Sequence, residues 1–273
     1  MGMAIIVSIV AQPEPLPSDS ISQREVSRLL NDDTVEFIWR NGYGGLTFRY
    51  SAGSRYFTWV PNSYRAQLER AIMRAAWVSP YIRVPEFDSI RPGFGGWWTS
   101  SAALPGDSAV RDIGKSQPAR TVAAIATGLR QLHDRAPAAN CPFRWNYDVS
   151  AAAHKIATSN TWRDYPDAEY ANLPVDVALD YLRNGNGLSH DLVVCHGDPC
   201  SPNTIIDNAG NFVGLVDLGD LGVADRWADL AIASWSLNWN YGPGWEDLFF
   251  QVYGIIPNPE KITYYRLLWA CAE

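Results

Sequence analysis

The chain has 273 residues, of which 47% are hydrophobic and 19% are charged. This composition is typical of a globular protein and not of a disordered one. A chain of this length can bury a large core and form one large domain or two lobes. Its 22 basic and 29 acidic residues give a net charge of −7, which disfavours a nucleic-acid partner and favours a cationic small molecule.

Cysteine usage and hydropathy indicate a cytoplasmic protein with no membrane partner. Cys141, Cys195, Cys200 and Cys271 have neither a disulfide-rich nor a zinc-finger spacing. Cys195, His196 and Cys200 lack the fourth ligand that structural zinc requires, so reduced thiols are the simpler interpretation. No stretch reaches the roughly 20 apolar residues of a membrane span.

Three strands are predicted after a flexible leader at residues 1–20. Aromatic and apolar residues alternate with polar ones over Val35–Trp39, Leu46–Tyr50 and Arg55–Trp59. The first turn, Asn41–Gly45, contains glycines whose backbone can approach an anion closely. By itself this turn is equally consistent with an ordinary hairpin and with a loop that covers phosphates.

A helix and a further strand follow. Asn62 or Ser63 can cap a helix that runs to about Val78, with Arg65 and Glu69 spaced as an exposed i,i+4 ion pair. Trp97–Ser101 is predicted as an edge strand that leads into a break.

The rest of the chain is predicted to be mainly helical. His133, near the end of the first of these helices, is interpreted as a packed or capping histidine. The Asp225–Trp239 helix is predicted to be amphipathic, and its acidic residues favour the helix dipole. The helical segments are Pro118–Asp134, Val149–Thr158, Pro174–Leu182, Asp225–Trp239, Trp245–Tyr253 and Asn258–Trp269.

A predicted β-hairpin organises the second half of the chain. Two β-type runs, Thr204–Ile206 and Phe212–Val216, are separated by Asp207–Asn211, which holds the Asn and Gly residues that tight turns require. If the runs pair antiparallel, the start of the first lies beside the end of the second. Asn203 is therefore expected next to Asp217.

Polar residues gather at this end of the hairpin. Asp198 lies on the loop that leads into the hairpin. Its carboxylate is expected to converge with the carboxylate of Asp217 and the amide oxygen of Asn203. Such oxygen ligands suit magnesium, and one carboxylate remains free to act as a base. His196 is interpreted as a hydrogen-bonding residue that braces the loop.

The motifs of this region resemble those of the aminoglycoside phosphotransferase family. His-Gly-Asp at His196–Asp198 is followed after four residues by Asn203, then by Val216–Gly219 and by the Asp-Arg-Trp-containing stretch Gly222–Ala231. The likeness is greatest to the branch that phosphorylates streptomycin- and kanamycin-type antibiotics. Because the spacing is intact across all of these segments, the joint pattern is much more specific than His-Gly-Asp alone.

The resemblance implies an α+β, two-lobed, protein-kinase-like fold. Residues 1–98 would form a nucleotide-binding lobe with an antiparallel sheet and a helix, and residues 99–105 a hinge. Residues 106–273 would form a larger, mainly helical lobe that carries the catalytic hairpin and binds the substrate.

The resemblance also implies ATP or GTP and Mg²⁺ as cofactors. Asp198 would accept the proton of a substrate hydroxyl, while Asn203 and Asp217 would hold magnesium. Asp225 and Asp229 would have a largely structural role and brace the catalytic loop. The substrate would be a hydroxylated, cationic small molecule, foremost an aminoglycoside antibiotic, and the protein a monomer or dimer.

Family members bind the nucleotide through the first lobe. In this sequence the corresponding residues are Gly44 and Gly45 over the phosphates, Thr58 and Glu69 beside them, and Ser101 and Ala103 at the adenine.

The chain departs from the family pattern in two places. Thr58 stands where a phosphate-binding lysine is expected, with Arg49 or Arg55 as possible substitutes. In antibiotic kinases of this family the last helix typically carries acidic residues that hold the ammonium groups of the drug. In this chain Glu273 is the only acidic residue of the corresponding stretch, which begins at Leu268. Two alternatives therefore remain: a weakened or non-catalytic nucleotide-binding homologue, and a kinase for another hydroxylated metabolite.

Overall fold

The computed structural model describes Val26 and residues 35–42, 44–50, 54–145, 147–163, 170, 172–185, 187–188 and 190–271. The predicted leader at residues 1–20 and Glu273 lie outside these residues. The chain divides into two compact units. The sheet unit comprises the described residues up to Ser79 together with Val84–Pro105, and the helical unit comprises Pro80–Arg83 and the residues from Gly106 on.

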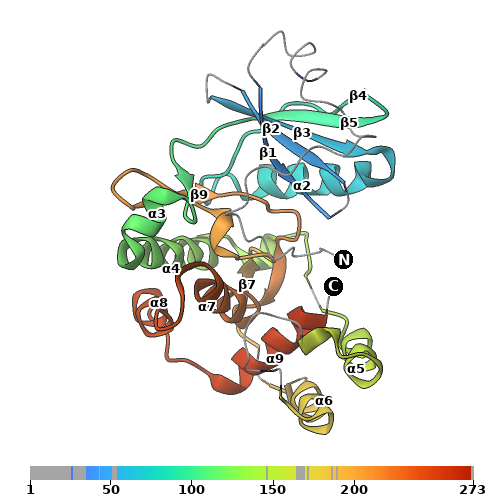
Figure 1. The fold of residues 1–273 in the computed structure, drawn as a ribbon, viewed down its shortest axis with the longest axis vertical. Helices are drawn as coiled ribbons and strands as arrows, with labels where there is room; N and C mark the ends of the chain where they lie inside the picture. Colours follow the sequence, from blue (N-terminus) through green and yellow to red (C-terminus); the bar gives the residue numbers. More distant parts are fainter. Residues whose placement is uncertain are drawn as a thin grey trace. The chain divides into compact units, whose positions relative to one another are not determined.

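The sheet unit contains a five-stranded antiparallel sheet in the order β1-β2-β3-β5-β4 (Figure 1). A short 3-10 turn at Asn62–Tyr64 leads from the sheet into the helix of this unit. The predicted strands and helix are confirmed, within a residue or two at most ends. The elements are β1 (Glu36–Arg40), β2 (Leu46–Arg49), β3 (Arg55–Pro61), α2 (Arg65–Val78), β4 (Arg91–Gly93) and β5 (Gly96–Ala102).

The prediction that Trp97–Ser101 forms an edge strand is wrong. β5 lies between β3 and β4, with Arg91 opposite Trp98 and Pro92 opposite Trp97. β4 is the edge strand, and it contains the proline that edge strands tolerate.

Alternation along β2 and β3 builds the core of the sheet unit. Leu46, Phe48, Phe57 and Trp59 are buried on one face, and the rings of Phe48 and Phe57 pack edge to face with centroids 6.0 Å apart. Thr58 points to the opposite face, because successive side chains of a strand alternate.

The helical unit is built around α7 (Trp227–Tyr241), which packs against α4, α8 and α9 (Figure 1). Every residue from Trp227 to Leu237 is buried, so the prediction of an amphipathic helix is wrong. An apolar helix of this kind is stable only when other elements surround it. The other helices are α3 (Asp112–Ser116), α4 (Pro118–Arg135), α5 (Val149–Thr158), α6 (Val175–Gly185), α8 (Glu246–Tyr253) and α9 (Pro259–Cys271).

Five short strands lie in the described part of the helical unit. β8 (Thr204–Ile206) pairs with β9 (Phe212–Leu215) on one side and with β6 (Asp107–Ser108) on the other, all antiparallel. β7 (Leu192–Cys195) pairs with β10 (Gly222–Asp225). The mixed fold, with an antiparallel N-terminal sheet followed by a mainly helical part, agrees with the predicted fold class.

In the described part of the chain, no helix combines the length and the apolar character that crossing a membrane requires.

Candidate active site

The β8–β9 hairpin forms as the sequence predicts. Thr204 lies opposite Leu215, and the turn is closed by the side chain of Asp207. This carboxylate accepts hydrogen bonds from the backbone N–H groups of Ala209 and Asn211, at 2.9 and 2.8 Å. Gly210 adopts a φ of +77°, a conformation that glycine reaches without strain.

Asn203, at the start of the hairpin, is hydrogen-bonded to Asp198 and to Val216, the residue before Asp217. Its carbonyl accepts a hydrogen bond from the N–H of Val216 at 3.0 Å. Its Nδ2 donates to the backbone carbonyl of Asp198 at 2.9 Å and to Asp198 Oδ2 at 3.1 Å. The predicted convergence of Asp198 and Asn203 is therefore present in the structure.

The two oxygens of the Asp198 carboxylate differ in their surroundings. Oδ2 accepts the hydrogen bond from Asn203, whereas Oδ1 is buried and has no hydrogen-bond partner within the described residues. Leaving a buried acceptor unpaired is costly, so this oxygen is suited to receive a hydrogen bond from a molecule that binds there.

Asp217 is the second residue after β9 and has a φ of +58°, which is unusual for a residue other than glycine. The residue is exposed to solvent. Desolvation by nearby protein, followed by the charges of Asp198 and Asp220, raises the pKa of Asp217 above its usual value. Crowded carboxylates and an amide oxygen are a donor set that fits Mg²⁺.

His196 links the loop after β7 to the end of the hairpin and is completely buried. Its Nε2 donates to the carbonyl of Val216 at 3.0 Å, and its Nδ1 accepts from the N–H of Asp198 at 3.3 Å. These partners correspond to a neutral ring protonated on Nε2. The hydrogen-bonding role predicted for His196 is confirmed.

Asp229, in the first turn of α7, fixes the same loop. Its buried carboxylate accepts hydrogen bonds from the N–H groups of His196 at 2.6 Å and of Gly197 at 3.1 Å. Gly197 has a φ of +89°, and a Cβ there would lie 2.3 Å from the carbonyl oxygen of Asp220. The sequence predicted a place for Asp229 at the start of the helix, and the family resemblance implied that it braces the catalytic loop; these contacts confirm that role.

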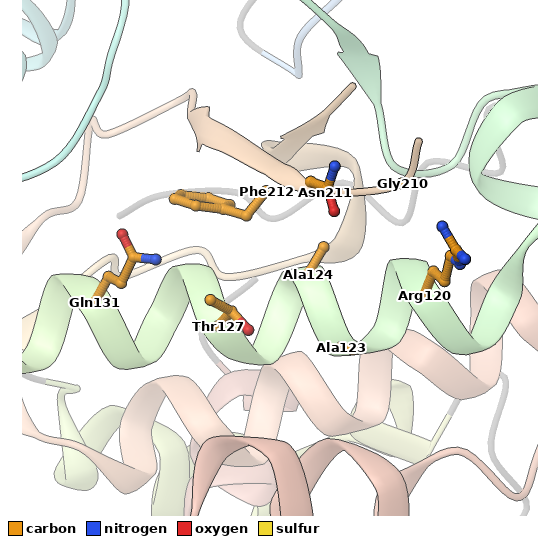
Figure 2. A pocket seen from close by; sticks show the side chains of 8 residues that line it. All are labelled: Arg120, Ala123, Ala124, Thr127, Gln131, Gly210, Asn211 and Phe212. Carbon is orange, nitrogen blue, oxygen red and sulfur yellow. The ribbon is translucent and has the colours of Figure 1, made fainter. Parts of the chain in front are cut away.

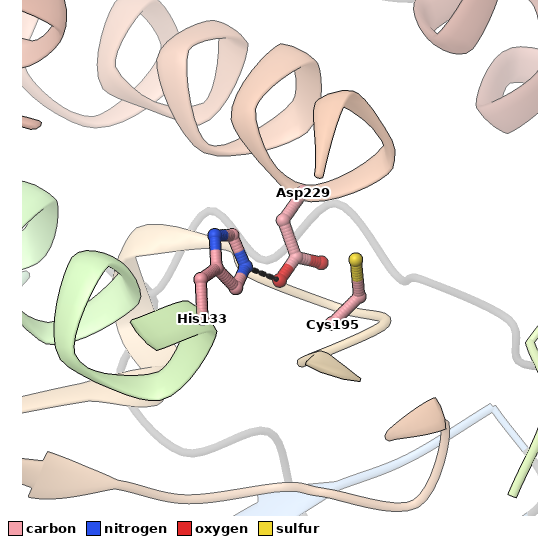
Figure 3. Close-up of side chains that lie close together, drawn as sticks. All are labelled: His133, Cys195 and Asp229. Carbon is pink, nitrogen blue, oxygen red and sulfur yellow. Dashed lines mark hydrogen bonds and ion pairs between the residues drawn. The ribbon is translucent and has the colours of Figure 1, made fainter. Parts of the chain in front are cut away.

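His133 lies on the other side of the Asp229 carboxylate (Figure 3). Its Nε2 contacts Asp229 Oδ2 at 2.9 Å, and its Nδ1 lies 2.7 Å from the hydroxyl of Tyr253. Arg226 donates to that hydroxyl at 2.8 Å. The prediction of a packed histidine is confirmed, since His133 is buried within this network.

His133, Cys195 and Asp229 bring three potential metal ligands within 4.8 Å of one another (Figure 3). The Cys195 thiol, however, donates to the carbonyl of Asp225 at 3.3 Å. Burial, followed by the charges of Asp229 and Asp225, raises the pKa of Cys195 well above its usual value. Because each of the three side chains already has hydrogen-bond partners, this cluster is a structural hydrogen-bond centre.

The turn with Gly44 and Gly45 connects β1 to β2. Gly44 has a φ of +77° and donates its N–H to the carbonyl of Asn41 at 3.0 Å. The Gly45 N–H donates to Asn41 Oδ1 at 2.7 Å. The turn is thus held together by Asn41, and its role toward phosphates stays a prediction.

Thr58 lies in the middle of β3, opposite Thr47 on β2 and Thr99 on β5. The two arginines considered as substitutes for the missing lysine are engaged elsewhere. Arg49 forms an ion pair with Glu36 at 2.7 Å, and Arg55 pairs with Asp88.

Glu69 forms the exposed i,i+4 pair with Arg65 at 2.8 Å, as its spacing predicted. The Arg65 guanidinium also lies over the ring of Trp97, 3.9 Å from its centroid.

Ser101 is buried in β5, and the N–H of Ala103 donates to the carbonyl of Ser54 at 2.9 Å.

A separate open groove of about 400 Å³ lies between α4 and the β8–β9 hairpin (Figure 2). None of the predicted site residues lines it, so it is not part of the Asp198 site. Its lining residues are Arg120, Ala123, Ala124, Thr127, Gln131, Gly210, Asn211 and Phe212.

Comparisons with known proteins agree on one family. Residues 42–265 match the model of the phosphotransferase enzyme family, abbreviated APH. The chain is 34% identical over 243 residues to streptomycin 3''-kinase of Streptomyces griseus, which covers 81% of this chain and 86% of that protein.

Solved structures show the same likeness. Aminoglycoside phosphotransferase APH(3'')-Id from Streptomyces rimosus superposes with a TM-score of 0.74 at 29% identity, covering 91% of this chain and 96% of that one. Its complex with ADP and streptomycin superposes with a TM-score of 0.66 at 29% identity, covering 84% and 90%.

Proposed function

Because the chain belongs to the phosphotransferase enzyme family, we propose that it transfers a phosphoryl group from ATP to a hydroxyl of an aminoglycoside. The similarity to a streptomycin 3''-kinase and to a structure that holds ADP and streptomycin supports this substrate class. The observation that carries the proposal is the Asp198 carboxylate, which Asn203 holds through Oδ2 while the buried Oδ1 has no hydrogen-bond partner in the described part of the chain.

Asp198 would act as the base. The substrate hydroxyl donates its hydrogen bond to Asp198 Oδ1, which orients the hydroxyl oxygen toward the γ-phosphorus. As the new O–P bond forms, the proton passes to Oδ1 and the bond from the γ-phosphorus to the bridging oxygen breaks, releasing ADP. The transfer requires positioning and charge neutralisation and no covalent enzyme intermediate.

Asn203 and Asp217 would hold magnesium. The Nδ2 of Asn203 donates hydrogen bonds to Asp198. The Oδ1 of Asn203 would therefore be the atom that binds magnesium, and Asp217 would supply a carboxylate. When bound, the ion neutralises the charge of the nucleotide phosphates. A dication would also favour the ionised form of Asp217, whose carboxyl is crowded by Asp198 and Asp220.

The nucleotide would be held by residues of the sheet unit. We assign Gly44 and Gly45 to the phosphates, Thr58 and Glu69 to positions beside them, and Ser101 and Ala103 to the base. We also propose that residues 1–98 and 106–273 form the two lobes and that residues 99–105 form the hinge. The protein would act in the cytoplasm, where its free cysteines would stay reduced.

The test is phosphate transfer from ATP with magnesium to a panel of aminoglycosides, for the parent protein and for Asp198→Ala. We expect the parent to phosphorylate streptomycin or a relative, and the variant to lose turnover by at least about 100-fold while it still binds nucleotide. Asp180→Ala removes an exposed carboxylate and serves as the control. Full activity of Asp198→Ala would refute the role of the base.

A second candidate is a homologue with weakened or no catalysis, which Thr58 in place of lysine favours. It predicts a parent protein that binds ATP but transfers phosphate to no member of the panel. Transfer to hydroxylated metabolites in place of aminoglycosides would instead identify a kinase with another substrate.

A further inference from the structure

Asn203 ends a short 3-10 turn, Ser201–Asn203, that joins the catalytic loop, which carries Asp198, to β8. The first N–H groups of a helical turn have no partner within the turn, so another part of the chain must supply one. The N–H of Ser201 donates to Ser236 Oγ at 2.9 Å, and Ser236 lies on α7. Both serines are completely buried, so water does not compete for this hydrogen bond. The start of the turn is therefore fixed by the central helix.

The Ser236 hydroxyl has a defined orientation. Its oxygen accepts from the N–H of Ser201 and from the Nδ2 of Asn240, the latter at 3.1 Å. Because these two donors occupy both lone pairs, the hydroxyl must donate its one proton elsewhere, and Ser201 Oγ lies 3.1 Å away to accept it. Asn240, one helical turn further along α7, also donates to the carbonyl of Ser236 at 2.8 Å. Asn240 therefore sets the direction in which the Ser236 hydroxyl points.

Three further contacts hold the rest of the turn. Ser108 Oγ, from β6, donates to the carbonyl of Pro202 at 2.8 Å. The carbonyl of Asn203 accepts from the N–H of Val216 at 3.0 Å, and its Nδ2 donates to Asp198. These contacts fix the backbone of the turn and one side of the Asn203 amide, which leaves Oδ1 as the atom that can bind a cation.

We propose that Ser236 is a positioning residue for the magnesium site and that Asn240 acts with it by orienting its hydroxyl. The inference rests on the proposed function, because it takes Asn203 as a magnesium ligand. Groups that hold a metal ligand from behind determine how well the ligand is placed, and their loss weakens metal binding. Without the Ser236 hydroxyl, the buried N–H of Ser201 loses its acceptor, which is costly, so the turn shifts. Asn203, two residues further along, shifts with it.

The experiment compares the parent protein with Ser236→Ala and, as a matched control, Ser234→Ala. Ser234 is an equally buried serine on the same helix, and its hydroxyl contacts Ala231 and Arg266. Calorimetry measures the Kd for ADP with magnesium and again with EDTA, and urea denaturation measures stability. Since each change removes buried hydrogen bonds of a serine hydroxyl, both variants should unfold at a lower urea concentration than the parent.

We expect Ser236→Ala to raise the Kd for ADP with magnesium by about threefold to tenfold, which corresponds to one neutral hydrogen bond. The Kd with EDTA should stay unchanged, and Ser234→Ala should change neither value. Asn240→Ala alters a partly exposed position and keeps the Ser236 hydroxyl, so it should give a smaller rise with magnesium only. It decides the inference if Ser236→Ala does not fold.

The outcomes separate this inference from the proposed function. A rise limited to magnesium in Ser236→Ala would support the inference even if the parent phosphorylates no aminoglycoside. An unchanged Kd, or an equal rise with EDTA or in Ser234→Ala, would overturn it. If Asn203→Ala binds ADP with magnesium as tightly as the parent, the metal role of Asn203 is wrong and the inference fails with it. ADP binding by the parent that does not depend on magnesium would overturn both.

Discussion

Asp229 connects the central helix to the catalytic loop through a single buried carboxylate. Its two oxygens accept the N–H groups of His196 and Gly197 and contact the ring of His133. Each of these donors would be unpaired in the interior without the carboxylate. The position of Asp198, one residue beyond Gly197, therefore depends on the hydrogen bonds that the Asp229 side chain accepts.

We predict that Asp229→Asn weakens both stability and turnover. An asparagine side chain places an N–H₂ group against backbone donors, which costs about 2–4 kcal/mol of the free energy of unfolding. A shift of Asp198 by a fraction of an ångström should lower kcat about 10- to 100-fold. Urea denaturation and kinetics test this, with the exposed Asp247→Asn as control. Unchanged kcat in a folded variant would contradict the positioning role.

The residues that the sequence identified are those whose neighbours are close in the chain or set by one hairpin. Asn203 could be placed beside the end of the second strand because an antiparallel hairpin brings the start of its first strand to that end. The contacts of Asp229 with the loop were expected only from the family resemblance, since they depend on how α7 packs. No local pattern records that packing.

Arg266 joins three helices of the helical unit. From α9, its Nε donates to the carbonyl of Ala231 at 3.1 Å, and its Nη2 donates to Ser234 Oγ at 3.0 Å. The Nη2 also pairs with Glu246 of α8 at 2.5 Å. The guanidinium is almost fully buried, so its N–H donors connect α9 to α7 and α8 at one point.

Arg266→Lys is expected to lower the free energy of unfolding by about 1–3 kcal/mol, because an ammonium cannot reproduce the planar fork of donors. The midpoint of urea denaturation measures this loss. Arg183→Lys changes an exposed ion pair and should shift the free energy by less than about 0.5 kcal/mol. Equal effects of the two changes would show that the buried contacts of Arg266 contribute little.

Helices of the second half were predicted with nearly correct ends, because the 3.6-residue periodicity and the capping residues are local. The hairpin strands β8 and β9 were also predicted, but three other short strands were not. β4, β6 and β10 have two to four residues each, and their partners determine them. The same limit explains why β5 was assigned to the edge of the sheet and why α7 was expected to have a solvent face.

The whole molecule carries a net charge of −7, which favours a cationic acceptor but opposes the binding of nucleotide phosphates. Magnesium would offset part of this repulsion in the helical unit. In the sheet unit, Thr58 supplies no charge, and Arg49, Arg55 and Arg65 are all paired with carboxylates. Turnover by the parent protein is therefore expected to be limited by how well the phosphates are held.

Thr58→Lys tests this limit. If Thr58 faces the phosphates, an ammonium there should lower the KM for ATP and raise kcat, together increasing kcat/KM for ATP by at least about tenfold, since one charge-assisted hydrogen bond contributes about 1.5–3 kcal/mol. Thr58→Met has a similar length without the charge and is the matched control.

Three results are distinguishable. A gain by the lysine variant alone would show that the scaffold is complete except for one charge. Equal activity of the parent and both variants would show that phosphate binding relies on other groups. A gain with methionine as well would assign the effect to packing in β3, between Thr47 and Thr99, because only the volume of the side chain is common to both variants.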